Sequence, residues 1–324
     1  MVHTLIEYAK TMPADSYERA MVELFPQELD FLEIMPFASA PSGAFRWQEE
    51  AGLPENMGFR AINETPAEGH GVVNDRVEQT FPIAGNIDVD RVLIARHGPQ
   101  RRALERRLSI KKKMKVWADT FIGGDNLTSP REFSGLKSRL KAVGSGTSAV
   151  DGTNYESRIL ANSTASGGGA LSLSVLDRAI GLVENPNAII MPKALLNRLP
   201  AAERDTGVSG FVQQTQNEMG RDVTKYAGIP IYTGYGLSPY GEFLGFNEVG
   251  LGGGAASTTS IYVVRFSEDG VCGLEQSPMQ VTDMGLRENG VHYRDNIEHD
   301  VGMGIFDRYA AIRVSSVTNA AIVK

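Results

Sequence analysis

The chain has 324 residues, 42% hydrophobic and 22% charged, an ordinary globular composition with enough length for about two domains. The net charge of −7 argues against a dedicated nucleic-acid-binding protein, and the single cysteine, Cys272, excludes an intrachain disulfide. The N-terminus lacks the pattern of a secretory signal, and no run of about 18 apolar residues predicts a membrane span. We therefore expect a soluble protein inside the cell that makes it.

The first 90 residues predict an arm followed by a long hairpin. Short helical patterns in residues 1–35 are interrupted by prolines, so this segment needs a partner surface in its own chain or on a neighbour. Strands are expected at residues 45–48 and 77–87, on either side of a polar excursion rich in glycine and proline. A loop of that length is in most cases functional or ordered by a partner.

The strongest helix signal follows, from Pro99 to the glycine pair Gly123 and Gly124. Proline is favourable at the first helical position, and glycine is a common stop signal. About 24 residues of helix would span roughly 36 Å. Five apolar residues share one narrow stripe and predict the buried face: Ala103, Ile110, Met114, Trp117 and Phe121. Leu104 and Leu108 lie on a second face.

The same helix concentrates the positive charge of the chain. Residues 96–115 contain nine Lys or Arg and one acid, Glu105, for a local charge of +8 and hence −15 elsewhere. Pairing within the helix cannot neutralise such an excess. Charge runs are in most cases solvated faces, but here we expect acids from this chain or from a neighbour to lie against the helix. A weak contact with nucleic acid also stays open, although no base-reading motif accompanies the run.

The remaining patterns predict a mixed α+β chain. Helices are expected at residues 173–184 and after Pro192, and a polar, mobile stretch at 208–224. Strands are expected at residues 157–160, 187–191, 229–233, 242–246, 260–266, 271–275, 280–284, 291–302 and 309–317.

Few residues suggest catalysis. His292, Asp295 and His299 have spacings that would gather metal ligands on a helix. Their segment alternates like a strand, however, and a strand would turn positions 292 and 295 to opposite faces. The glycine-rich stretches at 144–148 and 251–256 lack the lysine of a phosphate-binding loop, and no serine-hydrolase elbow is present. The sequence therefore predicts neither an enzyme nor a cofactor, and Cys272 is expected to be a small buried hydrophobe.

Four regions carry a resemblance to a known family. They are residues 87–91 (IDVDR), 121–125 with 132–136 (FIGGD and EFSGL), 226–231 (YAGIPI) and 306–314 (FDRYAAIRV). With the order of the elements, they resemble the tailed-phage major capsid protein of the Hong Kong 97-like fold, over most of the chain from residue 40 onward.

The resemblance implies a domain organisation. Residues 1–40 would be an N-terminal arm along a neighbour, and residues 41–77 an extended E-loop over the adjacent subunit. Residues 78–124 would form the peripheral domain with its long spine helix, and residues 125–275 the axial domain. Residues 276–324 would be strands that return to the peripheral domain.

The resemblance also implies a function: self-assembly into pentamers and hexamers of an icosahedral head that encloses double-stranded DNA. The expected location is the virion, after assembly in the cytoplasm of the bacterial host. Expected partners are further copies of the chain, a scaffolding protein, a portal and a decoration protein, with non-specific contact to packaged DNA and no membrane. The arm is too short to be a fused scaffolding segment, so a separate scaffolding protein or prior cleavage is expected.

Nine residues of the hairpin and the basic helix are our candidates for inter-subunit contact: Trp47, Leu53, Met57, Phe59, Arg101, Arg106, Lys111, Lys112 and Lys113. Two alternative functions stay open. One is an encapsulin-like cellular nanocompartment, which would enclose cargo protein instead of DNA. The other is a metal-dependent enzyme that would use His292, Asp295 and His299.

Overall fold

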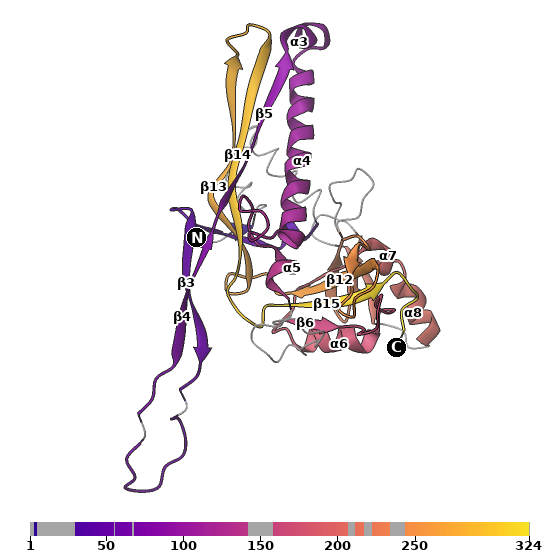
Figure 1. Cartoon of the computed structure of the whole chain (residues 1–324). Coiled ribbons are helices and arrows are strands. Elements are labelled where there is room, and N and C mark those ends of the chain that lie inside the picture. The colour runs from indigo at the N-terminus through magenta and orange to yellow at the C-terminus, as the bar shows by residue number, and fades with distance from the viewer. Residues whose placement is uncertain are drawn as a thin grey trace.

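The computed structural model describes residues 3–4, 30–54, 56–66, 68–141, 158–206, 211–216, 222–233 and 244–323. The described residues form a five-stranded sheet, an eight-stranded sheet and a two-stranded hairpin. The long helix α4 lies along the first sheet on one side of the molecule, and the hairpin points away in the opposite direction (Figure 1). The expected α+β class is confirmed.

The five-stranded sheet is built around one long hairpin. Its order is β1 (His3–Thr4), β2 (Pro36–Ser39), β13 (Val271–Leu286), β14 (His292–Ile305) and β5 (Phe81–Asp90). β13 and β14 pair from Val271 and Ile305 to Leu286 and Tyr293, and β5 pairs with β14 on the other side. The final sequence segments were expected as strands, and this hairpin confirms two of them.

Two short structural signals position α4 (Gln100–Gly123). Asp90 accepts a hydrogen bond from the backbone N–H of Val92 at 2.7 Å and caps the preceding helix α3 (Arg91–His97). Gly98 then adopts a φ of +79°, a left-handed conformation that glycine tolerates, and separates α3 from α4. At the other end, a Cβ on Gly124 would lie 2.4 Å from the carbonyl oxygen of Phe133, so only glycine fits. The predicted start and stop are confirmed.

The predicted apolar stripe of α4 is buried over its C-terminal half. Ile110, Met114, Trp117 and Phe121 are each at most 3% exposed. Ala103 is exposed, so its expected burial was wrong. The helix keeps its periodicity beyond the point where the apolar core ends, and periodicity alone does not mark that point.

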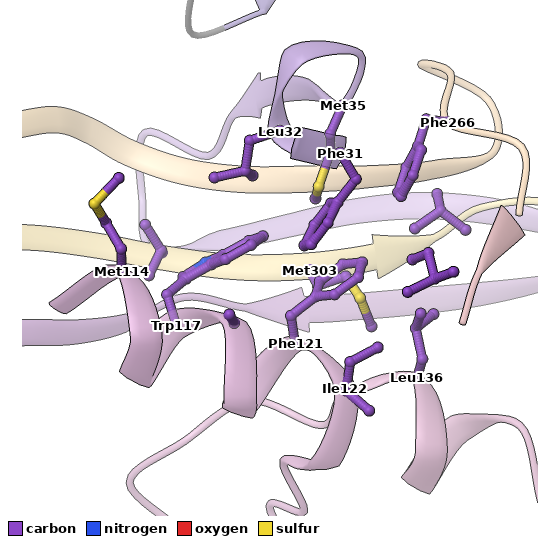
Figure 2. Packing of buried hydrophobic residues seen from close by; sticks show 14 of the residues in the cluster. Phe31, Leu32, Met35, Met114, Trp117, Phe121, Ile122, Leu136, Phe266 and Met303 are labelled. Carbon is purple, nitrogen blue, oxygen red and sulfur yellow. The ribbon is translucent and has the colours of Figure 1, made fainter. Parts of the chain in front are cut away.

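The last part of the expected N-terminal arm belongs to the core of its own chain. The short helix η1 (Asp30–Glu33) places Phe31 between the rings of α4 and Phe266 (Figure 2). The Phe31 and Phe121 ring centroids are 5.2 Å apart, and those of Trp117 and Phe121 are 5.1 Å apart. Residues 5–29 of the expected arm lie outside the described residues.

The eight-stranded sheet forms the second body of the molecule. Its order is β6 (Ile159–Ala161), β15 (Ala311–Thr318), β12 (Ala256–Val264), β7 (Ala188–Ile190), β10 (Ile229–Tyr232), β9 (Asp222–Tyr226) and β8 (Val212–Gln216), with β11 (Glu248–Val249) beside β12. The helices of this body are α6 (Leu173–Gly181), α7 (Lys193–Leu196) and α8 (Leu199–Thr206), whereas α5 (Leu136–Arg139) packs in the core of α4 through Leu136. Its apolar core joins α6 to β7, β12 and β15.

The second body corrects two expectations. The strand expected at residues 242–246 is absent from 244–246, and 242–243 lie outside the described residues. The polar stretch at 208–224 contains β8 and part of β9, which the sequence did not predict. The segment at 309–317, expected among the return strands of the peripheral domain, forms β15 and pairs with β12 and β6 instead. The partner of a strand depends on which distant segments pack together and bury their side chains, and local sequence patterns do not contain this information. The domain boundaries themselves remain predictions.

The hairpin consists of β3 (Ala44–Gly52) and β4 (Val72–Gln79), which pair from Ala44 and Gln79 to Gly52 and Val72. It projects from the body with the tip, residues 53–71, at its far end (Figure 1). A hairpin was predicted here and is present, but the second strand expected at 77–87 is divided: its start belongs to β4, and most of it lies in β5, which pairs with β14. No helix in the described ranges is long and apolar enough to cross a membrane.

Candidate assembly surfaces

The tip of the hairpin exposes large apolar side chains. Leu53, Met57, Phe59 and Ile62 are 77% to 112% exposed. Folded monomers seldom expose apolar patches of appreciable size, and such patches commonly mark interaction sites. Sequence reasoning singled out the first three as contact candidates and missed Ile62, an apolar residue in the same polar excursion that the same criterion selects.

The base of the hairpin is attached to the body by rings and by one ion pair. Phe45 and Trp47 lie on the same face of β3, and their ring centroids are 5.1 and 5.3 Å from that of Phe306. Arg139 donates to both carboxylate oxygens of Glu78 at 2.6 and 2.7 Å. These contacts fix the base of the hairpin on the body of the molecule. Trp47 has a contact inside its own chain, and its role between subunits remains a prediction.

The N-terminal half of α4 is held by two carboxylates, of which Asp295 is buried and Asp283 is half exposed. Arg102 Nε donates to Asp295 Oδ2 at 2.9 Å, and Arg106 Nε donates to the same oxygen at 2.6 Å. Both arginines also donate through Nη2 to Asp295 Oδ1 at 2.5 Å. Asp295 is fully buried, and Asp283 accepts a further bond from Arg102 at 2.5 Å. Donation from Arg102 holds the pKa of Asp283 below its usual range.

This cluster answers the expectation that acids lie against the basic helix. Two of them come from the same chain, on β13 and β14. Arg106 was a candidate contact residue, and it is engaged here within the chain. Arg102 was not a candidate, although it lies in the same basic run. Arg101 pairs with Glu105 at 2.5 Å along the helix.

The three candidate lysines have different environments. Lys112 is exposed and Lys111 is half-buried. Lys113 is only 7% exposed, and burial lowers its pKa from 10.5 to about 7. Nothing in the sequence pattern distinguishes Lys113 from its two neighbours, so its burial was not predicted. Lys111 and Lys112 are better placed than Lys113 to meet a second molecule.

The three residues of the candidate metal site have separate partners. His292 contacts Asn289 at 3.1 Å, Asp295 is bound by the two arginines, and His299 lies 3.4 Å from Glu275. All three belong to β14, so the strand interpretation is confirmed. No group of three His, Cys, Asp or Glu within the described ranges is arranged to hold a metal ion. Burial also lowers the pKa of His299.

Comparison with known proteins gives a clear structural answer. No protein-family model matches the chain, and a search of curated proteins finds no match. The holo-SrpI encapsulin of Synechococcus elongatus PCC 7942 is similar in structure, with 12% identity, a TM-score of 0.65, and coverage of 98% of this chain and 97% of that one. The capsid of the native GTA particle gives 14% identity, a TM-score of 0.59 and 89% coverage of both chains. The cyanophage A-1(L) capsid gives 14% identity, a TM-score of 0.59 and 95% coverage of both chains.

These similarities extend over nearly the whole chain. At such low sequence identities they show a shared fold and nothing more. They confirm the expected likeness to phage capsid proteins. The similarity to the SrpI encapsulin means that the encapsulin alternative, which the sequence left open, stays open. The chain therefore has the fold shared by phage capsid proteins and encapsulin shell proteins.

Proposed function

We propose that the chain is the major capsid protein of a tailed phage, which self-assembles into pentamers and hexamers of an icosahedral head around double-stranded DNA. The observation that carries this proposal is the hairpin: it leaves four large apolar side chains exposed at the end of a long projection, in a fold shared with shell proteins. An isolated two-stranded hairpin is only marginally stable in water. A neighbouring subunit would bury the tip.

The parts of the chain then take the roles of the Hong Kong 97-like fold. Residues 1–40 are the N-terminal arm and 41–77 the E-loop, with β3 and β4 as its strands. α4 is the spine helix of the peripheral domain, whose sheet is completed by β13 and β14. The second body, within residues 125–275, is the axial domain, and β15 is added to it by its pairing with β12.

Assembly through such a subunit uses two different surfaces that meet across each contact. Contacts of this kind form rings when the rotation between copies closes. The contact residues predicted from the sequence lie on the hairpin and on the helix. They are Trp47, Leu53, Met57 and Phe59 on the hairpin, and Arg101, Arg106, Lys111, Lys112 and Lys113 on the helix. Exposed cations such as Lys112 would contact packaged DNA without sequence preference. A separate scaffolding protein, a portal and a decoration protein complete the head in the host cytoplasm.

Electron microscopy of the protein, expressed alone and with its scaffolding partner, tests the proposal. We expect closed shells of uniform size. A matched control removes residues 53–71 and joins Gly52 to Val72 through an Asn-Gly turn, which suits two directly paired strand ends. This variant should remain folded, with unchanged thermal unfolding, and form no shells. Only compact monomers of the full chain under every condition would contradict the proposal, and normal shells from the variant would contradict the role of the hairpin.

The second candidate function is an encapsulin-like compartment. It is favoured by the similarity to the SrpI encapsulin, which covers 98% of the chain. The two candidates differ in their contents, so particles purified from the natural source decide between them. A capsid contains double-stranded DNA that resists nuclease until the particle is opened. A compartment contains protein cargo in a fixed ratio to the shell subunit.

A further inference from the structure

A pocket of about 380 Å³ lies between the base of the hairpin and the body of the molecule. That volume is in the range of small-molecule binding sites. Four arginines and two acids line it: Arg76, Arg139, Arg158, Arg308, Glu78 and Asp307. Positive charge is therefore in excess among the described residues of the lining, although the whole chain has a net charge of −7. We call this the arginine pocket.

The hairpin supplies one wall of the arginine pocket through a single face. Trp47 on β3 lies directly opposite Arg76 on β4, and residues opposite each other in an antiparallel pair share a face. Glu78 is two residues further along β4, so it lies on that face as well. The bonds from Arg139 to Glu78 turn this face toward the body. The fold thus brings Arg76 to the pocket from the side of the hairpin.

The body supplies the opposite wall from segments far apart in the sequence. Arg158 precedes β6, and Arg308 lies between β14 and β15. Arg158 is only 6% exposed, and it donates to the carbonyl oxygens of Ala311 and Leu182, both at 3.0 Å. Neutral carbonyl groups hold a guanidinium in position and leave its charge in place. Burial of that charge is unfavourable and lowers the pKa of Arg158.

The two acids of the pocket are already bound by arginines. Glu78 accepts from both Nη atoms of Arg139, at 2.6 and 2.7 Å. Asp307 accepts from Arg265 Nη2 at 2.6 Å, and Arg265 is not part of the lining. The remaining arginines of the lining add positive charge to these two pairs. A guanidinium has five N–H donors, so an arginine that has partners inside the chain can still donate to a bound anion.

The arrangement favours an anion with several oxygen atoms. One arginine is sufficient for a planar carboxylate, as the bidentate pair of Arg139 with Glu78 shows. Guanidinium groups on two facing walls suit a tetrahedral oxyanion, whose oxygen atoms point in several directions, and arginine is well suited to phosphate. The pocket is more than tenfold larger than the roughly 30 Å³ that one water molecule occupies in the liquid, so a hydrated phosphate fits.

We propose that the arginine pocket binds a small free oxyanion of the phosphate class, which bridges Arg76 on the hairpin to Arg158 and Arg308 on the body. Bound there, the anion joins the base of the projecting hairpin to the rest of its own subunit. The site goes beyond the proposed shell function and does not depend on it.

Isothermal titration calorimetry of the full chain with sodium phosphate tests the site. Sodium chloride keeps the ionic strength constant, so general screening does not change during the titration. We expect saturable binding of one phosphate per chain. The unfolding temperature should rise by about 2–4 °C at ten times the dissociation constant, because the ligand binds the folded state alone. Absence of saturable binding, or an equal rise with chloride at the same ionic strength, would overturn the proposal.

Arginines on opposite faces of the hairpin provide a matched pair of variants. Arg76 and Arg46 are both exposed, but Arg46 is adjacent to Trp47 on β3 and therefore points to the other face. Arg76→Gln should weaken phosphate binding about tenfold, the scale of one charge-assisted hydrogen bond, and Arg308→Gln should do the same from the body. Arg46→Gln should leave the affinity unchanged.

Unfolding temperatures without phosphate show whether these variants fold. We expect little change for Arg76→Gln and Arg46→Gln, since exposed substitutions change stability little. Equal weakening of phosphate binding by these two variants would indicate attraction by net charge alone and would overturn the site.

Nucleic acid is the competing source of phosphate groups. The titration is repeated in the presence of a short single-stranded oligonucleotide with a terminal phosphate. We expect free phosphate to keep its affinity, because the hairpin and the body enclose the pocket from two sides. Displacement of phosphate by the oligonucleotide would assign the arginines to nucleic acid and overturn the proposal. None of these results depends on shell formation, so the proposed function is tested separately.

Discussion

The C-terminal half of α4 lies in the apolar core, whereas its N-terminal half is held to the same sheet by arginine–aspartate pairs. In the C-terminal half, Met114, Trp117 and Phe121 are at most 3% exposed (Figure 2). In the N-terminal half, Arg102 and Arg106 bind Asp295, and Leu104 and Leu108 remain exposed.

The difference assigns a separate physical role to each half. Burial of large apolar side chains is the dominant source of folding stability and is not directional. Bidentate guanidinium–carboxylate bonds have a fixed geometry, so they set the position of a helix on its sheet. The N-terminal half of α4 can therefore be placed accurately on the sheet although Leu104 and Leu108 remain exposed. The predictions below test this division of roles.

The largest effect is expected in the apolar half. Phe121→Ala should lower the free energy of unfolding by about 3–5 kcal/mol, because it removes a buried ring and leaves a cavity. Chemical denaturation followed by circular dichroism measures the loss. The control is Leu104→Ala on the exposed face, with an expected change of about 0.5 kcal/mol or less. Similar losses for the two variants would contradict the assignment of the core.

An intermediate effect is expected in the ionic half. Asp295→Asn removes the charge that both arginines share and should cost about 2 kcal/mol, the scale of hydrogen bonds to charged groups. Asp283→Asn is the control; the Asp283 side chain is 52% exposed, so its loss should be smaller. The double variant should cost less than the sum of the two, since the carboxylates share Arg102. Strict additivity would show that the carboxylates act independently.

A smaller effect is expected at Lys113, where a substitution should raise the free energy of unfolding instead of lowering it. Lys113→Met should stabilise the subunit by about 1 kcal/mol at pH 6, because a charged amine is no longer buried. The pKa of Lys113 is lowered in the folded state, to about 7 from 10.5, so the unfolded state binds more protons in this window. The unmodified chain therefore gains stability as the pH rises through that range, and the advantage of the variant shrinks. Lys112→Met, at an exposed position, should show no such pH dependence.

The smallest effect is expected for a surface ion pair. The guanidinium of Arg294 donates to Asp88 and lowers the pKa of that carboxyl from 3.8 to about 2. The contribution of this carboxylate is present above pH 3.8 and is lost as the pH falls through about 2. In acid titrations followed by circular dichroism, Asp88→Asn should flatten the stability curve slightly in that window alone. Above pH 3.8 the variant should be less stable by a small, constant amount, and this loss should vanish as the pH falls through about 2. A loss that varies with pH near neutrality would assign Asp88 a different role.

Local sequence patterns predicted the parts of the structure that local forces determine. Pro99, the Gly123–Gly124 pair and a stripe at helical spacing were sufficient for α4, since helix formation depends on residues three and four apart. Alternation around a glycine- and proline-rich stretch was sufficient for the hairpin.

Long-range pairing was not predictable in the same way. Arg102 and Asp295 are 193 residues apart, and no periodicity connects them. The sequence indicated that the positive helix needed acids, but the identity of those acids follows from the register of β14 on β5. The membership of β15 in the second sheet and the burial of Lys113 have the same cause. Each depends on which distant surface packs against the segment.

Sedimentation velocity of the full chain beside the variant without residues 53–71 tests the central claim, assembly through the projecting hairpin. We predict that the full chain sediments as large closed particles, and that the variant sediments as folded single subunits, slightly lighter than the 35.1 kDa of the full chain, with an unchanged unfolding temperature. Identical sedimentation of the two proteins would contradict it, whether both form particles or both remain monomers with and without the scaffolding partner.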